Sequence, residues 1–133
     1  MIEKTFAMIK PDAVRAKCIG KIIDAIEQNG FAISRLEKRS IDQVLAKRFY
    51  AIHAEKPFFG ELIQNITAGP VIVMMLEKEN AIAEWRTLMG ATDPKKAADG
   101  TLRKRFGTSI GDNAVHGSDA PDTARTELKL MFP

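Results

Sequence analysis

His116 is the residue of this chain whose surroundings best suit covalent chemistry. It follows residues 113–115, which predict a short apolar strand, and it precedes a glycine that permits close backbone approach. Neutral imidazole is a good nucleophile near pH 7, because the unperturbed pKa of histidine is about 6.5, provided that a hydrogen bond holds one ring nitrogen. A phosphate acceptor needs this setting, although a lone histidine beside glycine is more often structural. The residues that could hold the ring are Ser118, Asp119 and Glu127.

Side chains that could bind phosphate oxygens are spread over the chain. Lys10 follows a predicted strand, Arg86 lies on a predicted helix, and Thr92 and Arg103 lie in a long loop. Phosphoryl transfer requires groups that neutralise the negative charge of several phosphate oxygens. The chain has no GxxxxGK[ST] loop and no protein-kinase signature, so side chains of separate elements would have to hold a nucleotide. Each of them, taken singly, could equally be a solvated surface residue.

The elements that must position these side chains alternate between strands and helices. Apolar and β-branched runs predict strands at residues 5–9, 31–38, 71–76 and 113–115. Of these, 71–76 is the expected central strand and 31–38 lies nearer an edge, because it is charged towards its end. Helical spacing of apolar residues predicts helices at 20–29, 42–54, 61–66, 80–89 and 122–131.

Local signals mark several ends of these elements. Gly30 is the expected stop of the first helix, and either Ser40 or Asp42 is expected to cap the second. Pro57 interrupts the helical pattern, and Trp85 is expected to fill the core or an interface. The loop from residue 90 onwards shows only a helical turn near 101–106.

This order of elements predicts an α+β fold. It is a ferredoxin-like βαββαβ arrangement, a four-stranded antiparallel sheet with helices on one face, extra helices and a long loop before the last strand. The fold by itself does not define a function, since it hosts many.

The composition narrows the class of protein. The 133 residues, 45% of them hydrophobic, suit one domain over residues 1–133. With 20 Lys and Arg against 17 Asp and Glu, the charge of +3 indicates a mild preference for anionic partners. Cys18 is the only cysteine, which excludes an intrachain disulfide and favours a reducing compartment. No apolar run approaches the roughly 18 residues of a membrane span, so we expect a cytoplasmic protein without membrane contact.

Six collinear segments resemble the nucleoside diphosphate kinase family in order and spacing. They are MIKPDA at 8–13, HAEKPFF at 53–59, TAGPV at 67–71, LMGATDP at 88–94, GTLR at 100–103 and NAVHGSD at 113–119. The resemblance runs over nearly the whole chain. It implies an enzyme that transfers the γ-phosphate of a nucleoside triphosphate, such as ATP, to a nucleoside diphosphate. The implied mechanism is ping-pong through a phosphohistidine on His116, with broad base and sugar tolerance.

The resemblance also assigns roles to individual residues. The implied catalytic set is His116, Lys10, Tyr50, Ser118 and Glu127. The implied nucleotide-binding set is Lys10, His53, Phe58, Leu62, Arg86, Thr92, Arg103, Ile110 and Asn113. Phe58 and Ile110 would sandwich the base, although without the resemblance both could equally be core residues. The implied cofactor is Mg²⁺ carried on the nucleotide phosphates, with Asp119 reaching it at most through water and no direct protein ligand.

The oligomeric state is predicted only by the family resemblance, and no residue pattern of the chain indicates it independently. The resemblance implies a homo-oligomer, a tetramer or a hexamer built from dimers, in which the loop proline Pro94 supports subunit contacts. Lys104 and Arg105 depart from the family pattern. These two added cations could either alter nucleotide affinity or be surface charges, and we favour the second interpretation.

Two other readings of the sequence compete with the kinase. A ferredoxin-like nucleic-acid-binding module would fit the sequence pI near 9.1, but it should expose aromatic residues on its sheet. The strands carry Phe6 and Phe31 and no Lys/Arg-Gly-Phe run. A catalytically silent relative is disfavoured because every expected site residue is present. Nucleic acid is not required by the kinase reading.

Overall fold

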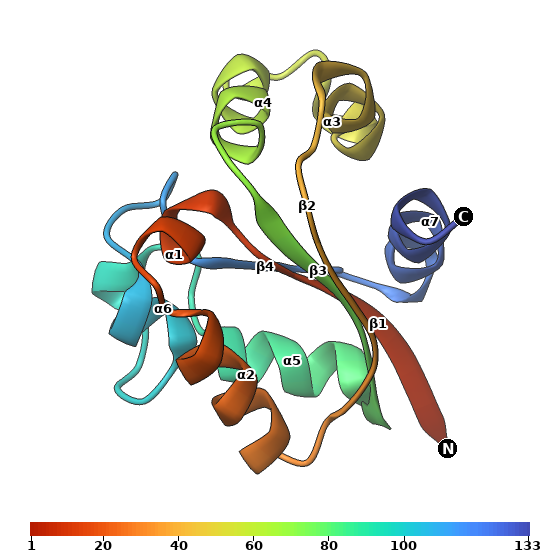
Figure 1. Cartoon of the computed structure of the whole chain (residues 1–133), viewed down its shortest axis with the longest axis vertical. Helices are drawn as coiled ribbons and strands as arrows, with labels where there is room; N and C mark the ends of the chain where they lie inside the picture. Colours follow the sequence, from red (N-terminus) through yellow and green to blue (C-terminus); the bar gives the residue numbers. More distant parts are fainter.

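A computed structural model describes residues 1–133 as one sheet flanked by helices (Figure 1). The elements follow in the order β1 (Ile2–Ile9), α1 (Pro11–Arg15), α2 (Ile19–Gln28), β2 (Ala32–Arg39), α3 (Gln43–Phe49), η1 (Ala51–His53), α4 (Phe59–Ile66), β3 (Val71–Glu79), α5 (Ala81–Met89), η2 (Pro94–Lys96), α6 (Leu102–Phe106), β4 (Val115–Gly117) and α7 (Pro121–Met131). None of these helices combines the length and the apolar composition that crossing a bilayer requires.

The sheet has four strands in the order β2-β3-β1-β4, and each neighbouring pair is antiparallel. This confirms the predicted ferredoxin-like fold. β3 is an interior strand and β2 an edge strand, as their composition predicts. β4 pairs with β1 so that His116 lies opposite Met8. The last strand therefore carries the histidine into the sheet beside the central strands.

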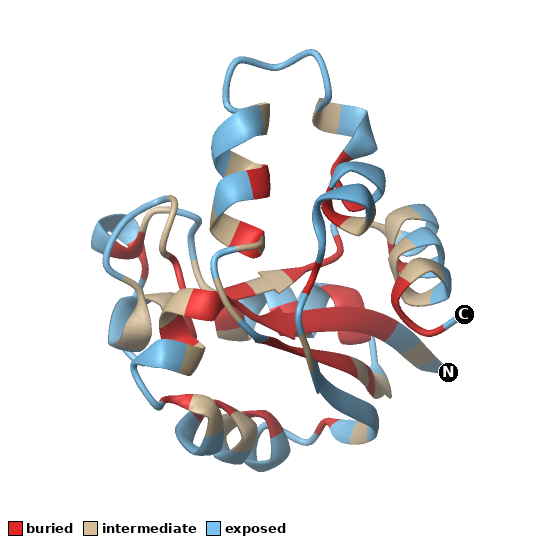
Figure 2. Cartoon of the chain, turned by 45° about the horizontal axis from the view of Figure 1, so that its top comes forward, coloured by how far each residue is buried: buried red, intermediate tan, exposed pale blue.

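Side chains that alternate along the strands supply a core to each face of the sheet. In β1, Ala7 and Ile9 belong to the core beneath α2 and α5, whereas Phe6 and Met8 belong to the core beneath α3, α4 and α7. The two helices of the βαββαβ unit thus cover one face, and the extra helices cover the other. Figure 2 shows the resulting buried band along the sheet and the exposed outer sides of the helices.

Both aromatic residues that could have served a nucleic-acid-binding sheet are buried. Phe6 is fully buried in one core, and Phe31 is 4% exposed in the other. Phe31 also packs edge-on against Trp85, which fills the core as predicted. The sheet therefore lacks the exposed aromatic face on which such modules stack bases.

Several helix ends follow their predicted signals. α2 is followed by Gly30 in the left-handed conformation, with φ of 86°, as expected for a glycine just beyond a helix. Asp42 caps α3 by accepting a hydrogen bond of 2.8 Å from the backbone N–H of Leu45. The predicted helix over 42–54 is wrong in its length, because α3 ends at Phe49 and a 3-10 turn follows.

Two local features near His116 differ from the sequence analysis. Pro11 starts the short helix α1, which was not predicted, because its fixed φ suits the first helical position. The last strand covers Val115–Gly117 and not residues 113–115, so His116 lies within it. The reason is Ala114, whose left-handed φ of 73° is incompatible with a strand. The predicted helical turn near 101–106 is confirmed as α6.

Candidate active site

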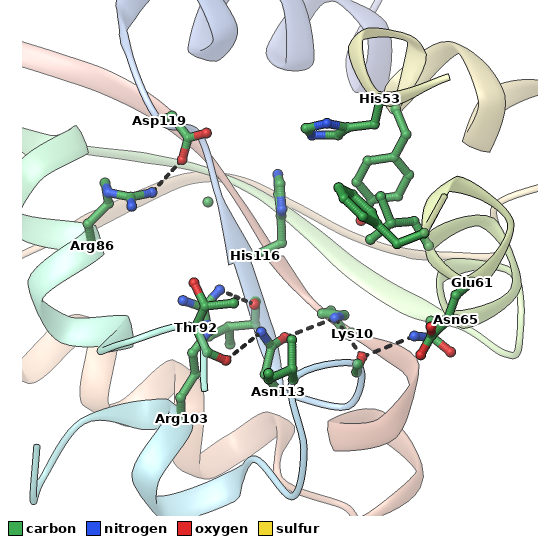
Figure 3. Close-up of a pocket in the computed structure, with 17 residues that line it drawn as sticks. Lys10, His53, Glu61, Asn65, Arg86, Thr92, Arg103, Asn113, His116 and Asp119 are labelled. Carbon is green, nitrogen blue, oxygen red and sulfur yellow. Dashed lines mark hydrogen bonds and ion pairs between the residues drawn. The ribbon is translucent and has the colours of Figure 1, made fainter. Parts of the chain in front are cut away.

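One cavity of about 590 Å³ lies between the sheet, the α3–α4 hairpin and the long loop, with residues far apart in the sequence around it (Figure 3). The predicted site residues that line it are Lys10, Tyr50, His53, Phe58, Leu62, Arg86, Thr92, Arg103, Ile110, Asn113, His116 and Asp119. The lining residues that were not predicted are Glu61, Asn65, Gly111, Val115 and Gly117. Of the predicted residues, only Ser118 and Glu127 lie outside the lining. Glu127 contacts the ring of His116, and Ser118 contacts Glu127.

The imidazole of His116 is held from one side by a carboxylate. Its Nε2 lies 3.2 Å from one oxygen of Glu127 and 3.3 Å from the other, and Ser118 Oγ donates a hydrogen bond of 2.6 Å to the same carboxylate. An ionised carboxylate only accepts hydrogen bonds, so this contact places the proton on Nε2. Nδ1 is left with its lone pair. The side chain is 22% exposed, which leaves the ring open to the cavity.

Aromatic packing fixes the plane of the ring. Phe49 and Tyr50 meet it edge-on, with centroids 5.0 Å and 6.3 Å from that of His116. Burial, and secondarily the nearby Glu127, raises the pKa of Tyr50 above its ordinary value of 10, so its phenol stays neutral.

The backbone around His116 is held by Trp85. Its Nε1 donates to the carbonyl of His116 at 3.3 Å. A Cβ on Gly117 would lie 2.4 Å from the indole ring, so the close approach expected of this glycine is made by Trp85. The sequence identified Trp85 as a core residue but gave no signal of this contact.

Lys10 brings a buried cation to the floor of the cavity. Its side chain is 8% exposed, and Nζ donates to Asn113 Oδ1 at 2.9 Å and to the carbonyl of Gly111 at 3.0 Å. Asn113 in turn donates through Nδ2 to the carbonyl of Thr92 at 3.1 Å. Burial lowers the pKa of Lys10 from its ordinary value, against the opposing effect of Asp12. The ammonium is thus fixed in place but weakly solvated.

Two arginines complete the positive side of the cavity. Arg103 donates to the carbonyls of Gly90 and Val115, both at 3.0 Å, while its Nε is buried without a hydrogen-bond partner. Burial and the neighbouring Arg86 lower the pKa of Arg103 to about 10. Arg86 is more exposed and forms an ion pair with Asp119 across the rim (Figure 3).

The apolar residues of the lining form a wall that is open to solvent. Phe58 is 45% exposed and Ile110 is 60% exposed, and Leu62, which also lines the cavity, is half-buried. His53 joins this wall to the histidine end, with its ring centroid 5.7 Å from Phe58 and 6.3 Å from Tyr50. Large apolar side chains seldom stay this exposed without a ligand or partner when they line a cavity.

Three polar residues near the cavity were missed by the sequence analysis. Asn65 donates through Nδ2 to the carbonyl of Gly111 at 3.3 Å, and a Cβ on Gly111 would lie 2.9 Å from this nitrogen. Glu61 lies one helical turn earlier on the same face, and this spacing in the predicted helix could have indicated a shared polar face. Asp12 accepts a hydrogen bond from the backbone of Ala114, a tertiary contact for which the sequence offers no signal.

The cavity offers little to bind a metal ion directly. No group of three or more His, Cys, Asp or Glu side chains is arranged to hold one. Asp119 is the carboxylate nearest the histidine strand on the rim, and it is already paired with Arg86. This donor set fits a cation that is bound mainly by ligand oxygens and water, and not a metal site of the protein alone.

Comparisons with known proteins agree with this geometry. The family model described as nucleoside diphosphate kinase matches residues 3–133. A nucleoside diphosphate kinase of Pelobacter propionicus is 52% identical over 131 residues, which are 98% of this chain and 96% of that protein.

Solved structures give the same match in three dimensions. The crystal structure of the Aquifex aeolicus nucleoside diphosphate kinase superposes with a TM-score of 0.97 at 39% identity, over 100% of this chain and 96% of that one. The Halobacterium salinarum nucleoside diphosphate kinase, solved in complex with CDP, gives 0.95 at 42% identity, over 99% and 88%. The chain therefore belongs to the nucleoside diphosphate kinase family of enzymes.

Proposed function

We propose that this chain transfers the γ-phosphate of a nucleoside triphosphate to a nucleoside diphosphate by a ping-pong mechanism through a phosphohistidine on His116. The observation that carries the proposal is the contact between His116 Nε2 and Glu127 at 3.2 Å, which leaves Nδ1 unprotonated in a cavity bordered by cations. A nucleophile, a group that orients it and neighbouring positive charge are the parts that covalent phosphoryl transfer needs.

In the first half-reaction the lone pair of His116 Nδ1 attacks the γ-phosphorus. The N–P bond forms as the bond between the γ-phosphorus and the bridging oxygen breaks, and the diphosphate leaves with that electron pair. The carboxylate of Glu127 keeps the proton on Nε2 and stabilises the positive charge that develops on the ring, while Ser118 orients the carboxylate.

The cations of the cavity would neutralise the phosphate oxygens. Lys10, Arg86 and Arg103 line it with Thr92, and Arg103 keeps a buried Nε without an internal partner. Fixed donors directed at developing charge lower the barrier because they need no reorganisation during the reaction. The neutral phenol of Tyr50 would support the ring of His116 and the transferring group.

In the second half-reaction another nucleoside diphosphate enters the same cavity. Its terminal phosphate oxygen attacks the phosphorus, the N–P bond breaks, and His116 regains its lone pair. Asn113 and Lys10 would bind the sugar, and Phe58, Leu62 and Ile110 would hold the base by stacking and apolar contact. Since every base has a flat face, this wall supports broad base tolerance.

Mg²⁺ would enter with the nucleotide and would neutralise part of the phosphate charge when bound. Asp119 is the side chain placed to contact its hydration shell, and His53 completes the phosphate-binding set. A homo-oligomer built from dimers, in which Pro94 supports subunit contacts, remains part of the proposal. The location in the cytoplasm and the single domain over residues 1–133 stay predictions.

Labelling with a γ-labelled nucleoside triphosphate tests the proposal. The protein should retain label that is stable in alkali and labile in acid, as a phosphohistidine is, and His116→Ala should abolish it. The chain has 2 histidines, so His53→Ala is the matched control, and it should still accept label at saturating nucleotide. Label that persists in His116→Ala would overturn the proposal.

A further inference from the structure

The carboxylate of Asp12 joins the start of α1, which Lys10 precedes, to the segment that carries His116. Asp12 lies in the first turn of α1, and its Oδ2 accepts a hydrogen bond of 3.0 Å from the backbone N–H of Ala114, 102 residues away. Its Oδ1 is buried without a hydrogen-bond partner. A carboxylate in this position carries a desolvation cost, so its retention in the fold calls for a physical reason.

The partner of Asp12 is the central residue of a strained turn. Ala114 has φ of 73°, and the N–H of Val115 donates to the carbonyl of Asn113 at 2.9 Å across it. A hydrogen bond between residues two apart, around a central φ near +75°, defines the γ-turn that is rare because it is strained. Ala114 is not a glycine and is fully buried, so its surroundings must hold this conformation.

Both backbone groups of Ala114 are held by the start of α1. Its N–H is bound by Asp12, and its carbonyl accepts from the backbone N–H of Lys10 at 2.8 Å. The turn separates Asn113, which binds the ammonium of Lys10, from Val115 and His116 in β4. The relative positions of the ammonium and the imidazole therefore depend on this turn together with the pairing of β4 with β1.

We propose that Asp12 is a positioning residue for phosphoryl transfer, because its carboxylate fixes the turn at Ala114 and thereby sets His116 and Asn113 relative to Lys10. The inference rests on the proposed function, because Asp12 would affect phosphoryl transfer only through the positions of His116, Asn113 and Lys10. Asp12 does not line the cavity, so it reaches the nucleotide only through these residues.

The charge of Asp12 adds a second effect on Lys10. Asp12 and Asp112 raise the pKa of Lys10, whereas burial, which is the largest effect, and Arg103 lower it. Removing the negative charge of Asp12 should make Lys10 lose its proton at lower pH. A residue that only stabilised the fold would not change the pH at which Lys10 loses its proton. The pH dependence of the variant therefore distinguishes a role at Lys10 from a role in folding alone.

Three variants and one control test the inference. Asp12→Ala removes the hydrogen bond to Ala114. We expect kcat/KM to fall about 10-fold to 100-fold, because small displacements of reacting groups lower the rate by such factors. Adding Ala114→Gly should restore part of this loss, because glycine adopts a positive φ without strain. Asp12→Asn keeps an acceptor for the N–H of Ala114, so it should lower kcat/KM less and should move the alkaline limb of its pH profile to lower pH.

Asp122→Ala is the matched control. Asp122 also follows a proline in the first turn of a helix, α7, but its carboxylate is exposed and pairs with Arg125. This variant should keep kcat/KM within about twofold.

Two results would overturn the inference. One is a folded Asp12→Ala variant with wild-type kcat/KM, and the other is an unmoved alkaline limb in Asp12→Asn, which serves if the alanine variant fails to fold. Failure of the proposed function is distinguishable, because the wild-type protein would then show no label that depends on His116.

Discussion

The two ends of the cavity differ in how firmly their side chains are held. At the proposed phosphate end, Lys10, Arg103 and Asn113 are tied by hydrogen bonds to the backbone of other elements, and Lys10 is 8% exposed. At the proposed base end, Phe58 and Ile110 are 45% and 60% exposed. This wall belongs partly to the α3–α4 hairpin, which projects from the sheet and has an exposed connecting loop (Figure 2).

This difference separates catalysis from recognition. Stabilising a charged transition state requires donors that are already in place, and the fold supplies them from several elements. An apolar wall with few polar groups discriminates little between bases, because stacking is similar for all of them. We therefore expect changes at the phosphate end to lower the rate strongly and changes at the base end to weaken all nucleotides alike.

The largest effect is expected from Lys10→Met. The variant keeps an unbranched side chain of similar volume but removes the cation. It also removes the donor to Asn113 Oδ1 and one of the two donors to the carbonyl of Gly111, which keeps Asn65. We expect kcat/KM to fall on the order of 10²-fold to 10³-fold, as for the loss of one fixed donor to a transition state. Steady-state kinetics measure it, and Lys47→Met, on the exposed side of α3, is the control. A loss below threefold in a folded protein would contradict the fixed phosphate end.

A somewhat smaller effect is expected from Glu127→Gln. An amide can donate or accept, so it no longer fixes the proton on Nε2 of His116. We expect kcat to fall on the order of 10²-fold with little change in KM, because Glu127 does not line the cavity. Asp122→Asn changes an exposed carboxylate of the same helix and should leave both constants unchanged. A rise in KM at constant kcat would instead place Glu127 in binding.

The dependence of kcat/KM on pH at the alkaline side should reflect the lowered pKa of the buried Lys10. Because the pKa of Lys10 is lowered, the protonated form that attracts phosphate is lost at lower pH than in an ordinary lysine. We expect kcat/KM to fall about tenfold per pH unit beyond a midpoint below pH 10.5, the ordinary lysine value. Lys10→Arg should move this limb to higher pH, because a guanidinium holds its proton more tightly than an ammonium. A limb that begins only above pH 10.5 would mean that the ammonium is well solvated.

The smallest effect is expected at the base end, from Phe58→Ala. The loss of a half-exposed stacking surface should raise KM roughly fivefold for every nucleotide, at the low end of base–aromatic stacking energies. The ratio of kcat/KM values between bases should change less than about threefold. Ile52→Ala, an exposed apolar residue outside the cavity lining, is the control. Selective loss of one base would show that this wall does discriminate.

Much of the fold could be predicted because it depends on local patterns. Apolar periodicity indicated the order of strands and helices, and the charges of residues 31–38 indicated an edge strand. The position of the last strand could not be predicted, because it depends on the left-handed turn at Ala114. That turn is held by Asp12 and Lys10 from the other end of the chain.

The candidate site also contains residues that could be predicted from the sequence and residues that could not. The family resemblance identified most of the side chains that line the cavity, including Lys10 and His116, but not Glu61 and Asn65. Asn65, Asp12 and the contact of Trp85 with the carbonyl of His116 were missed. Each of these residues acts by a hydrogen bond to backbone more than 30 positions away, and no residue type or spacing encodes such a bond.

A single-turnover chase tests most directly whether one histidine carries the phosphate between two nucleotides. The protein is labelled with a γ-labelled nucleoside triphosphate, freed of nucleotide, and mixed rapidly with an unlabelled diphosphate of a different base. We predict that the label leaves His116 and appears in the new triphosphate at a rate no slower than kcat. If the isolated protein yields no labelled triphosphate, and transfer occurs only when both nucleotides are present together, the account is contradicted.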